Sequence, residues 1–243
     1  MSLKIVYLGA KDIGTNCFRV LLERAATLNY EIVAARSRKS EAGKAISKLA
    51  EENKIPLLSS LDDLPECDII FSVQHHELLK KRHLQKARKI ALNLHLAPLP
   101  EYRGCNQFTF AILENAAEFG VTLHEMDTRI DHGAILAESR FSIPENCWVK
   151  TLYDLSEEKA LKLFQDTLPE IIAGKYVLTP QKDLEPLRPS QLHFRQEIED
   201  IKEIPLNLSA SEIDRRLRAT MMPGFEPPYC RIGGQKVYFR KSE

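Results

Sequence analysis

The feature that most constrains the fold is a regular alternation of short β-rich segments with segments of helical periodicity. The β-rich segments are 4–9, 31–37, 55–58, 67–73 and 89–95, and the helical patterns lie at 13–28, 42–53, 74–87 and 103–115. Such alternation predicts mainly parallel strands, because each crossover passes through a helix on a face of the sheet. The first half of the chain is therefore predicted to form an α/β, Rossmann-like, doubly wound and mainly parallel sheet.

The middle of the chain begins with two further strand-like segments, 120–127 and 134–143, joined by the loop TRIDHG. A long helix is predicted over 151–174. Thr151 and Asp154 fit a capping box at its start, and Gly174 is a residue type that commonly ends a helix. Both strands and the helix are expected to complete the same α/β domain.

The last part of the chain has a different character. A polar, Pro-rich segment at 179–192 is typical of a linker, Ser209 and Glu212 fit a capping box, and 231–239 predicts a hairpin that turns at two glycines. The predicted organisation is a catalytic domain at 1–180, a linker at 181–206 and a small C-terminal subdomain of one helix plus a β-hairpin at 207–243.

Composition excludes several classes of protein. The 243 residues are 44% hydrophobic, enough for a full core, and Lys+Arg and Asp+Glu number 34 each, so the global charge suggests neither a nucleic-acid nor a membrane partner. Five scattered cysteines without a CxxC motif fit a reducing compartment. The amino terminus lacks the design of a signal peptide and no apolar run would span a bilayer, so a cytoplasmic location is expected.

An unusual polar pair lies within the strand-like segment 89–95. Asn93 and His95 are two residues apart, so a strand would place both on one face. Pro98 and Pro100 stop the strand at once, and ligands of open α/β sheets collect at the carboxyl ends of strands. The pair is therefore expected to face a cleft, although a single buried histidine is more often structural than catalytic.

Three motifs in order carry a resemblance to a known family. They are Asn93-x-His95, a Leu-Pro pair followed by Arg103-Gly104, and Asp131-His132-Gly133. Together they resemble the signature of the folate-dependent formyltransferases, a family that includes methionyl-tRNA and glycinamide ribonucleotide formyltransferases. The strings HLAPLPEYRGCNQF and FSIPENCWVKTLYDL are most similar to the members that act on nucleotide-linked, dTDP-type amino sugars.

The resemblance implies a reaction and three catalytic residues. An amine attacks the formyl carbon of N10-formyltetrahydrofolate, the co-substrate, through a tetrahedral species with negative charge on oxygen. His95 would be the general base, because an imidazole titrates near working pH. Asn93 would donate an N–H to the oxyanion, and Asp131 would orient His95, stabilise its protonated form and help to relay protons to the departing folate nitrogen.

The family also implies two binding pockets. Residues expected on the folate side are Gln74, His76, Leu92, Asp127 and Ile130. Residues expected on the side of the nucleotide sugar are Arg103, Asn106, Gln107, Phe225 and Tyr229, with Arg103 suited to a phosphate and the two aromatic rings to stacking on a base. Asp127 is equally explained as a solvated loop charge, and the two rings by packing of the terminal hairpin.

Several alternatives and partners complete the prediction. His75 and His76 resemble a metal pair, but two neighbouring residues without a further cluster of ligands are weak evidence, so no metal is predicted. The expected product serves surface polysaccharide (O-antigen) biosynthesis, and the exposed strand edges of the terminal segment suggest a homodimer.

Two alternative functions stay open. They are a formyltransferase with another amine acceptor, namely glycinamide ribonucleotide or methionyl-tRNA, and an inactive nucleotide-binding protein on the same scaffold. The tRNA is disfavoured because the chain ends soon after the linker without a sizeable basic domain.

Overall fold

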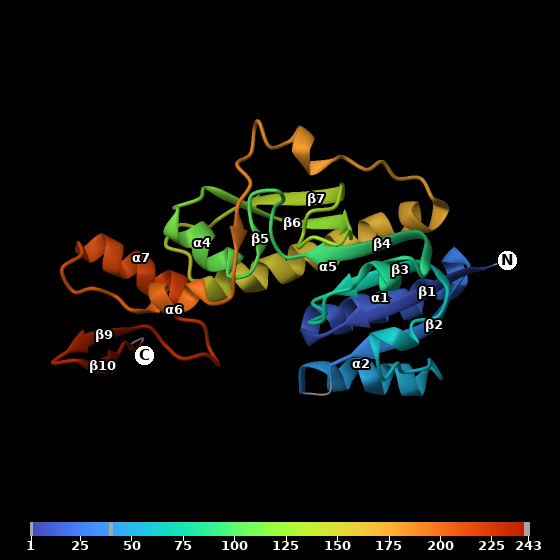
Figure 1. Ribbon diagram of the computed structural model, residues 1–243, viewed down its shortest axis with the longest axis horizontal. Helices are drawn as coiled ribbons and strands as arrows, with labels where there is room; N and C mark the ends of the chain where they lie inside the picture. Colours follow the sequence, from blue (N-terminus) through green and yellow to red (C-terminus); the bar gives the residue numbers. More distant parts are fainter. Residues whose placement is uncertain (1, 39–40, 241–243) are drawn as a thin grey trace.

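A six-stranded sheet forms the centre of the molecule, in a computed structural model that describes residues 2–38 and 41–240 (Figure 1). The strand order is β2-β1-β3-β4-β6-β7. The strands are β1 (Leu3–Gly9), β2 (Tyr30–Ser37), β3 (Cys67–Val73), β4 (Ala87–His95), β6 (Glu118–Glu125) and β7 (Ile135–Ser142). The first four run parallel, while β6 pairs antiparallel with both β4 and β7. The prediction of a doubly wound, mainly parallel sheet is confirmed, with an antiparallel edge.

Helices and short segments cover both faces of this sheet. The main helices are α1 (Lys11–Leu28), α2 (Glu41–Glu52) and α5 (Val149–Ala173). The larger core joins α1 and α5 to one face, where Phe18 and Phe164 are fully buried beside Phe71 of β3. On the opposite face Val6, Ile70 and their neighbours pack against a thinner layer that includes the 3-10 turn Leu61–Asp63. Burial on both faces explains why the central strands β1 and β3 consist of nearly unbroken apolar runs.

The C-terminal part packs against the end of the sheet that carries β6 and β7. Its helices are α6 (Glu197–Lys202) and α7 (Ala210–Thr220), and α7 contacts α4 (Gln107–Leu113) through a third apolar cluster. The predicted capping box of Ser209 and Glu212 opens α7, and the predicted hairpin forms between β9 (Tyr229–Ile232) and β10 (Gln235–Tyr238). Both local predictions are confirmed because each depends on residues that are close in sequence.

Three other local predictions are wrong. The segment 55–58 forms only an isolated bridge from Leu57 to Ala35, because Pro56 lacks the N–H that a longer ladder needs. The segment 74–87 is mostly irregular and contains only α3 (Lys81–Leu84), and the left-handed backbone of Gln74 (φ 55°) prevents a helix from starting at this residue. The helix α5 begins at Val149, before the predicted capping box, and Asp154 pairs with Lys150 instead.

Residues 179–195, here called the strap, lie across the sheet rather than forming a free linker. The strap contains a 3-10 turn (Gln181–Asp183) and β8 (Leu192–His193), which pairs with β5 (Arg103–Gly104). Figure 1 shows the strap in orange, arching from the end of α5 over β6 and β7 and returning beside β5. The C-terminal subdomain predicted at 207–243 extends beyond Arg240, the last described residue. Among the described helices, none is both long and apolar enough to cross a membrane.

Candidate active site

The strand β4 carries Asn93 and His95 to the edge of the sheet where the parallel strands end. Both side chains lie on one face of the strand, as their spacing predicts, and His95 is buried while Asn93 is partly buried. The main chain then leaves the sheet through Leu96 and Pro98, both buried. The pair is therefore fixed on a rigid element, at the edge of the sheet where ligands of open α/β folds bind.

A second imidazole lies beside this pair because of the strand register. In the antiparallel pairing of β4 with β6, Asn93 lies opposite His124 and His95 lies opposite Thr122. The Nδ2 atom of Asn93 is 3.2 Å from Nε2 of His124, whose side chain is almost fully buried. Sequence reasoning missed His124. Its alternation with Thr122 in the segment 120–127 would have indicated a polar face, but only an antiparallel register places it against Asn93.

Asp131 reaches the same point from the loop between β6 and β7. Its backbone is left-handed, with φ at 46°, which is uncommon for a residue with a side chain. Gly133 follows in the motif because a Cβ atom there would lie 1.9 Å from the carbonyl oxygen of Glu125. The Asp-x-Gly motif thus lets the loop fold tightly onto the end of β6 and directs the Asp131 carboxylate inward.

The carboxylate of Asp131 contacts both histidines, Asn93 and one backbone amide. Its Oδ2 lies 3.6 Å from Nδ1 of His95 and its Oδ1 lies 3.5 Å from Nε2 of His124. Asn93 Nδ2 donates a long hydrogen bond of 3.5 Å to Oδ1, and the amide of Gly104 donates one of 3.0 Å to Oδ2. The predicted trio of Asn93, His95 and Asp131 is therefore brought together by two distant segments.

Two backbone carbonyls fix which nitrogen of each imidazole carries a proton. Nε2 of His95 lies 2.7 Å from the carbonyl oxygen of Tyr102, and Nδ1 of His124 lies 2.8 Å from that of Glu125. A carbonyl oxygen only accepts hydrogen bonds, so both of these nitrogens donate. The basic nitrogen of His95 is consequently Nδ1, which faces Asp131, and that of His124 is Nε2, which accepts from Asn93.

The electrostatics of the site keep Asp131 ionised. Burial alone raises the pKa of this carboxyl group, but the imidazoles of His95 and His124, when protonated, and the hydrogen bond from the Gly104 amide lower it. The net result is a pKa well below the ordinary range of an aspartate. The ionised Asp131 carboxylate therefore lies next to Nδ1 of His95, where it can stabilise a positive charge on the imidazole.

The residues predicted for the sugar nucleotide lie in different surroundings. The guanidinium of Arg103 donates to Oε1 of Gln181 at 2.8 and 3.0 Å and to Glu185 at 3.2 Å, so acceptors within the protein already occupy it. Asn106 precedes α4 in a left-handed conformation and donates to the carbonyls of Phe194 and Arg195. Gln107 is the first residue of α4 and is partly buried.

The two aromatic residues of the C-terminal turn differ from each other. Phe225 is 69% exposed, whereas Tyr229 is only 6% exposed and its hydroxyl donates to Glu203. The Tyr229 ring is also covered by Lys236, 4.0 Å from its centroid. Packing of the hairpin therefore explains the position of the Tyr229 ring, while base stacking by Phe225 stays a prediction.

The residues predicted for the folate are dispersed around the sheet edge. Leu92 is fully buried in β4, and Ile130 is exposed on the loop that carries Asp131. Asp127 accepts from the amide of Arg129 at 2.7 Å and lies 2.9 Å from Nδ1 of His132, so it orders the turn of this loop. Gln74 accepts from Lys11 at the end of β3. A role for any of them in folate binding stays a prediction.

Within 2–38 and 41–240, three residues form a group that could hold a metal ion. They are His75, His76 and Glu77, whose potential ligand atoms lie within 4.8 Å of one another. Glu77 Oε1, however, accepts two hydrogen bonds from the Arg36 guanidinium, which would place a second cation at a metal ligand. This arrangement fits an ion pair better than a metal site.

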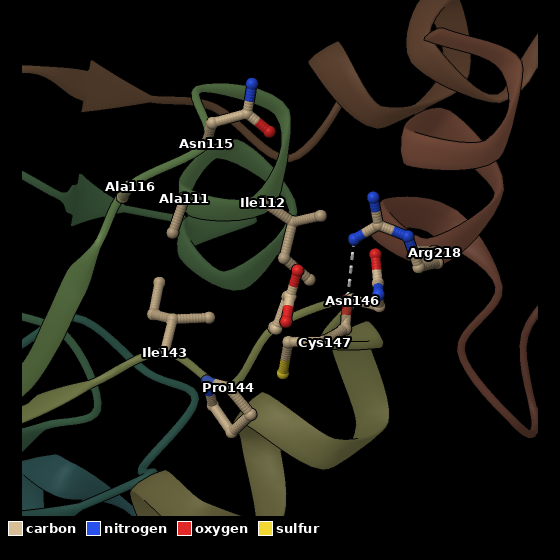
Figure 2. A pocket seen from close by; sticks show the side chains of 10 residues that line it. Ala111, Ile112, Asn115, Ala116, Ile143, Pro144, Asn146, Cys147 and Arg218 are labelled. Atoms are coloured by element: carbon tan, nitrogen blue, oxygen red, sulfur yellow. Dashed lines mark hydrogen bonds between the residues drawn. The ribbon is translucent and has the colours of Figure 1, made fainter. Parts of the chain in front are cut away.

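A surface pocket lies elsewhere, between α4, the loop 143–148 and α7. Figure 2 shows Ile112 and Ile143 on its apolar side and Arg218 reaching across from α7. The guanidinium of Arg218 donates to the carbonyl of Cys147 at 3.2 Å, which ties α7 to this loop. None of the residues that line this pocket was predicted to be functional, and none belongs to the trio.

Sequence comparisons place the chain beside known formyl transferases. A sequence model described as formyl transferase matches residues 23–168. The chain is 29% identical over 172 residues to GDP-perosamine N-formyltransferase of Brucella melitensis, covering 71% of this chain and 63% of that protein. It is 31% identical over 153 residues to methionyl-tRNA formyltransferase of Levilactobacillus brevis, covering 63% of this chain and 47% of that protein. The alignments thus span less than two thirds of these relatives.

The fold has a counterpart among solved structures. It matches the N-formyltransferase of Helicobacter canadensis, solved in complex with folinic acid and dTDP-3-aminofucose, with a TM-score of 0.79 and 25% sequence identity. This match covers 97% of the present chain and 86% of the other. The predicted formyltransferase fold is therefore confirmed over nearly the whole chain.

Proposed function

The chain belongs to the formyl transferase family, and from this premise we propose that it transfers a formyl group from N10-formyltetrahydrofolate to the amine of a nucleotide-linked amino sugar. The observation that supports this most directly is the convergence of Asn93, His95 and Asp131 at the end of β4. These side chains supply a hydrogen-bond donor, a base and an ionised carboxylate within one small volume. Acyl transfer to an amine needs these three kinds of group.

His95 is the general base in this proposal. Its Nε2 proton is held by the Tyr102 carbonyl, so the lone pair on Nδ1 takes the proton from the attacking amine. The imidazolium formed is stabilised by the Asp131 carboxylate, 3.6 Å away. Asp131 also limits the rotation of the ring, and the proton finally reaches the departing folate nitrogen.

Asn93 stabilises the oxyanion of the tetrahedral species. Its amide group donates to His124 at 3.2 Å and, through a longer bond of 3.5 Å, to Asp131. The longer bond is the weaker one, so its N–H is the donor that turns to the formyl oxygen when that oxygen becomes negative. The bond to His124 keeps the amide oriented throughout.

The acceptor that we propose is a dTDP-linked 3-amino or 4-amino dideoxy sugar, whose formylated product is used for surface polysaccharide (O-antigen) biosynthesis. Support comes from the H. canadensis enzyme, which was solved with dTDP-3-aminofucose and is similar over 97% of this chain. The B. melitensis relative is named for GDP-perosamine, so a GDP-linked amino sugar is the second candidate. We also propose that the enzyme is cytoplasmic and forms a homodimer. Ile232 and Val237 are exposed on the C-terminal hairpin and would provide an apolar surface for the second subunit.

The test is to incubate purified protein with N10-formyltetrahydrofolate and, separately, with dTDP-, GDP- and UDP-linked amino sugars. Mass spectrometry should detect a product heavier by one formyl group in the dTDP reaction. A methionyl-tRNA reaction belongs in the same panel, because the L. brevis relative is 31% identical. A product only from methionyl-tRNA, or from none of the acceptors, would contradict the proposed function.

A further inference from the structure

One buried glutamine of the strap connects the two segments that meet at Asp131. Gln181 is only 2% exposed, although glutamine is usually a surface residue. The strap reaches it directly after a two-bond bridge in which Thr179 and Ile135 exchange backbone hydrogen bonds of 2.8 Å. The position of Gln181 is thus fixed against the end of the Asp131 loop by backbone contacts, before its side chain is considered.

The side-chain amide of Gln181 binds two backbone carbonyls of the loop that carries Asp131. Its Nε2 donates to the carbonyl oxygen of Asp131 at 2.9 Å and to that of Gly133 at 2.8 Å. These two carbonyls flank His132, so both hydrogens of one amide group clamp the turn that gives Asp131 its left-handed backbone. If these donors were removed, both carbonyl oxygens would be partly buried without a hydrogen-bond partner, which would cost free energy.

The oxygen of the same amide holds the second segment. Oε1 accepts from Nε and Nη2 of Arg103, at 3.0 and 2.8 Å. Arg103 immediately precedes Gly104, whose N–H donates to the Asp131 carboxylate. One side chain therefore fixes the backbone of the carboxylate and, through Arg103, the segment that supplies a donor to that carboxylate.

The backbone of the strap supports the same arrangement. Arg103 N–H donates to the carbonyl of Gln191 at 3.0 Å, and Cys105 N–H donates to that of His193 at 2.9 Å. A side chain at position 104 would place Cβ 2.2 Å from the His193 carbonyl oxygen, so only a glycine permits this approach. The strap and the 103–105 segment thus meet at backbone distance.

We propose that Gln181 is a positioning residue for the formyl transfer, an inference that rests on the proposed function. It touches neither His95 nor Asn93 and acts through Asp131, by setting where the carboxylate lies relative to Nδ1 of His95. A misplacement of about 1 Å at a catalytic group can lower a rate by about 100-fold. Gln181 therefore controls the rate of the chemical step rather than the affinity for either substrate.

The experiment compares kcat and KM of wild type, Gln181→Met and Gln181→Glu on folded protein. Methionine has a similar length and none of the four hydrogen bonds, and glutamate keeps the contact with Arg103 but loses both donors. We expect kcat to fall about 10- to 100-fold in both variants, with KM for both substrates changed less than about threefold. The control is Gln191→Met, a glutamine of the same strap whose side chain contacts His193 and not the Asp131 loop. It should retain wild-type kcat.

A wild-type kcat in Gln181→Glu would overturn the proposal, because the donors to the loop would then be dispensable. A fall in melting temperature alone, with kcat unchanged, would overturn it as well, since this is what a packing role predicts.

Hydrogen exchange provides a readout that needs no substrate. The amides of Gly104 and Ile135, bonded to Asp131 Oδ2 and to the Thr179 carbonyl, should exchange at least about tenfold faster in Gln181→Met than in wild type or the control. Unchanged exchange at both would overturn the proposal. If wild type formylates none of the acceptors, the proposed function fails, whereas faster exchange would still support the hold of Gln181 on the loop.

Discussion

His95 and Asp131 face each other with Nδ1 of the imidazole 3.6 Å from Oδ2 of the carboxylate. Nε2 of the ring donates to the Tyr102 carbonyl at 2.7 Å, and a flip of the ring would replace Nε2 by Cε1 at this position and lose that hydrogen bond. The ring is therefore locked with its lone pair toward the carboxylate. This relationship determines which atom of His95 can accept a proton, and it makes the roles of the two residues separable by mutation.

His95→Asn and Asn93→Ala should each lower kcat by at least about 100-fold, because one removes the base and the other the oxyanion donor. Circular dichroism and melting curves should show folded protein for both variants, since both residues lie at the end of β4 rather than in its core. The rate is measured as formyl product by mass spectrometry with the acceptor that wild type uses. A rate within about threefold of wild type in either variant would contradict the role assigned to that residue.

His124→Phe should lower kcat by about tenfold, because Asn93 loses the acceptor that orients its amide. His124→Gln is the matched variant, since its side-chain oxygen can still accept from Asn93. We expect His124→Gln to retain kcat within about threefold of wild type. Equal rates in the two variants would show that the hydrogen bond from Asn93 to residue 124 has no influence on the reaction.

The contrast between Asn93 and His124 illustrates what the sequence could predict. The spacing of Asn93 and His95 follows from the geometry of one strand, and their position at its carboxyl end follows from the α/β alternation, so both were correctly predicted. His124 is near Asn93 only through the antiparallel register of β4 and β6. Register depends on tertiary pairing between distant segments, and local periodicity does not carry that information.

The strap illustrates a second limit. Its polar, Pro-rich composition predicts a linker, because such segments lack the periodic apolar face of a helix or strand. Gln181 is nevertheless buried, since its amide replaces water as the partner of two carbonyls and one guanidinium. A polar residue that is buried through specific hydrogen bonds cannot be distinguished by composition from one that is solvated.

Asp131→Asn should destabilise the protein at neutral pH by about 2 kcal/mol, because the low pKa of Asp131 means that folding favours its ionised form. A carboxyl group with a lowered folded-state pKa stabilises the fold above its unfolded pKa of about 3.9, and this contribution is lost as the pH falls further. The difference in unfolding free energy between wild type and variant should therefore be largest at pH 7 and should decrease below about pH 5. Urea unfolding at several pH values measures it.

Asp166→Asn is the matched control for this measurement. Asp166 is exposed on α5 and pairs with Lys162 one turn away, a contact worth only a few tenths of a kcal/mol. Its substitution should change stability little at any pH. If Asp131→Asn behaves like this control, the charged contacts of Asp131 do not stabilise the folded state.

His75→Leu should make the protein more stable than wild type in mild acid. Both ring nitrogens of His75 are buried without a hydrogen-bond partner among the described residues. Burial, followed by the charge on neighbouring His76, lowers the pKa of His75 to about 4. The unfolded chain takes up a proton near pH 6.5 and the folded protein only near pH 4, so wild-type stability falls as the pH drops between these values. At pH 5 the variant should gain about 2 kcal/mol relative to wild type.

At pH 7 the same substitution should be nearly neutral, because leucine has a similar volume and no hydrogen bond is lost. The control is His83→Leu, which removes another histidine with a buried side chain, one that does have partners. Nε2 of His83 lies 2.9 Å from Asp62, and Nδ1 accepts from the amide of Lys80 at 3.2 Å. His83→Leu should therefore destabilise the protein at both pH 5 and pH 7, as measured by urea unfolding. A loss of stability in His75→Leu at pH 5 would show that His75 has a partner in solution and would refute this account.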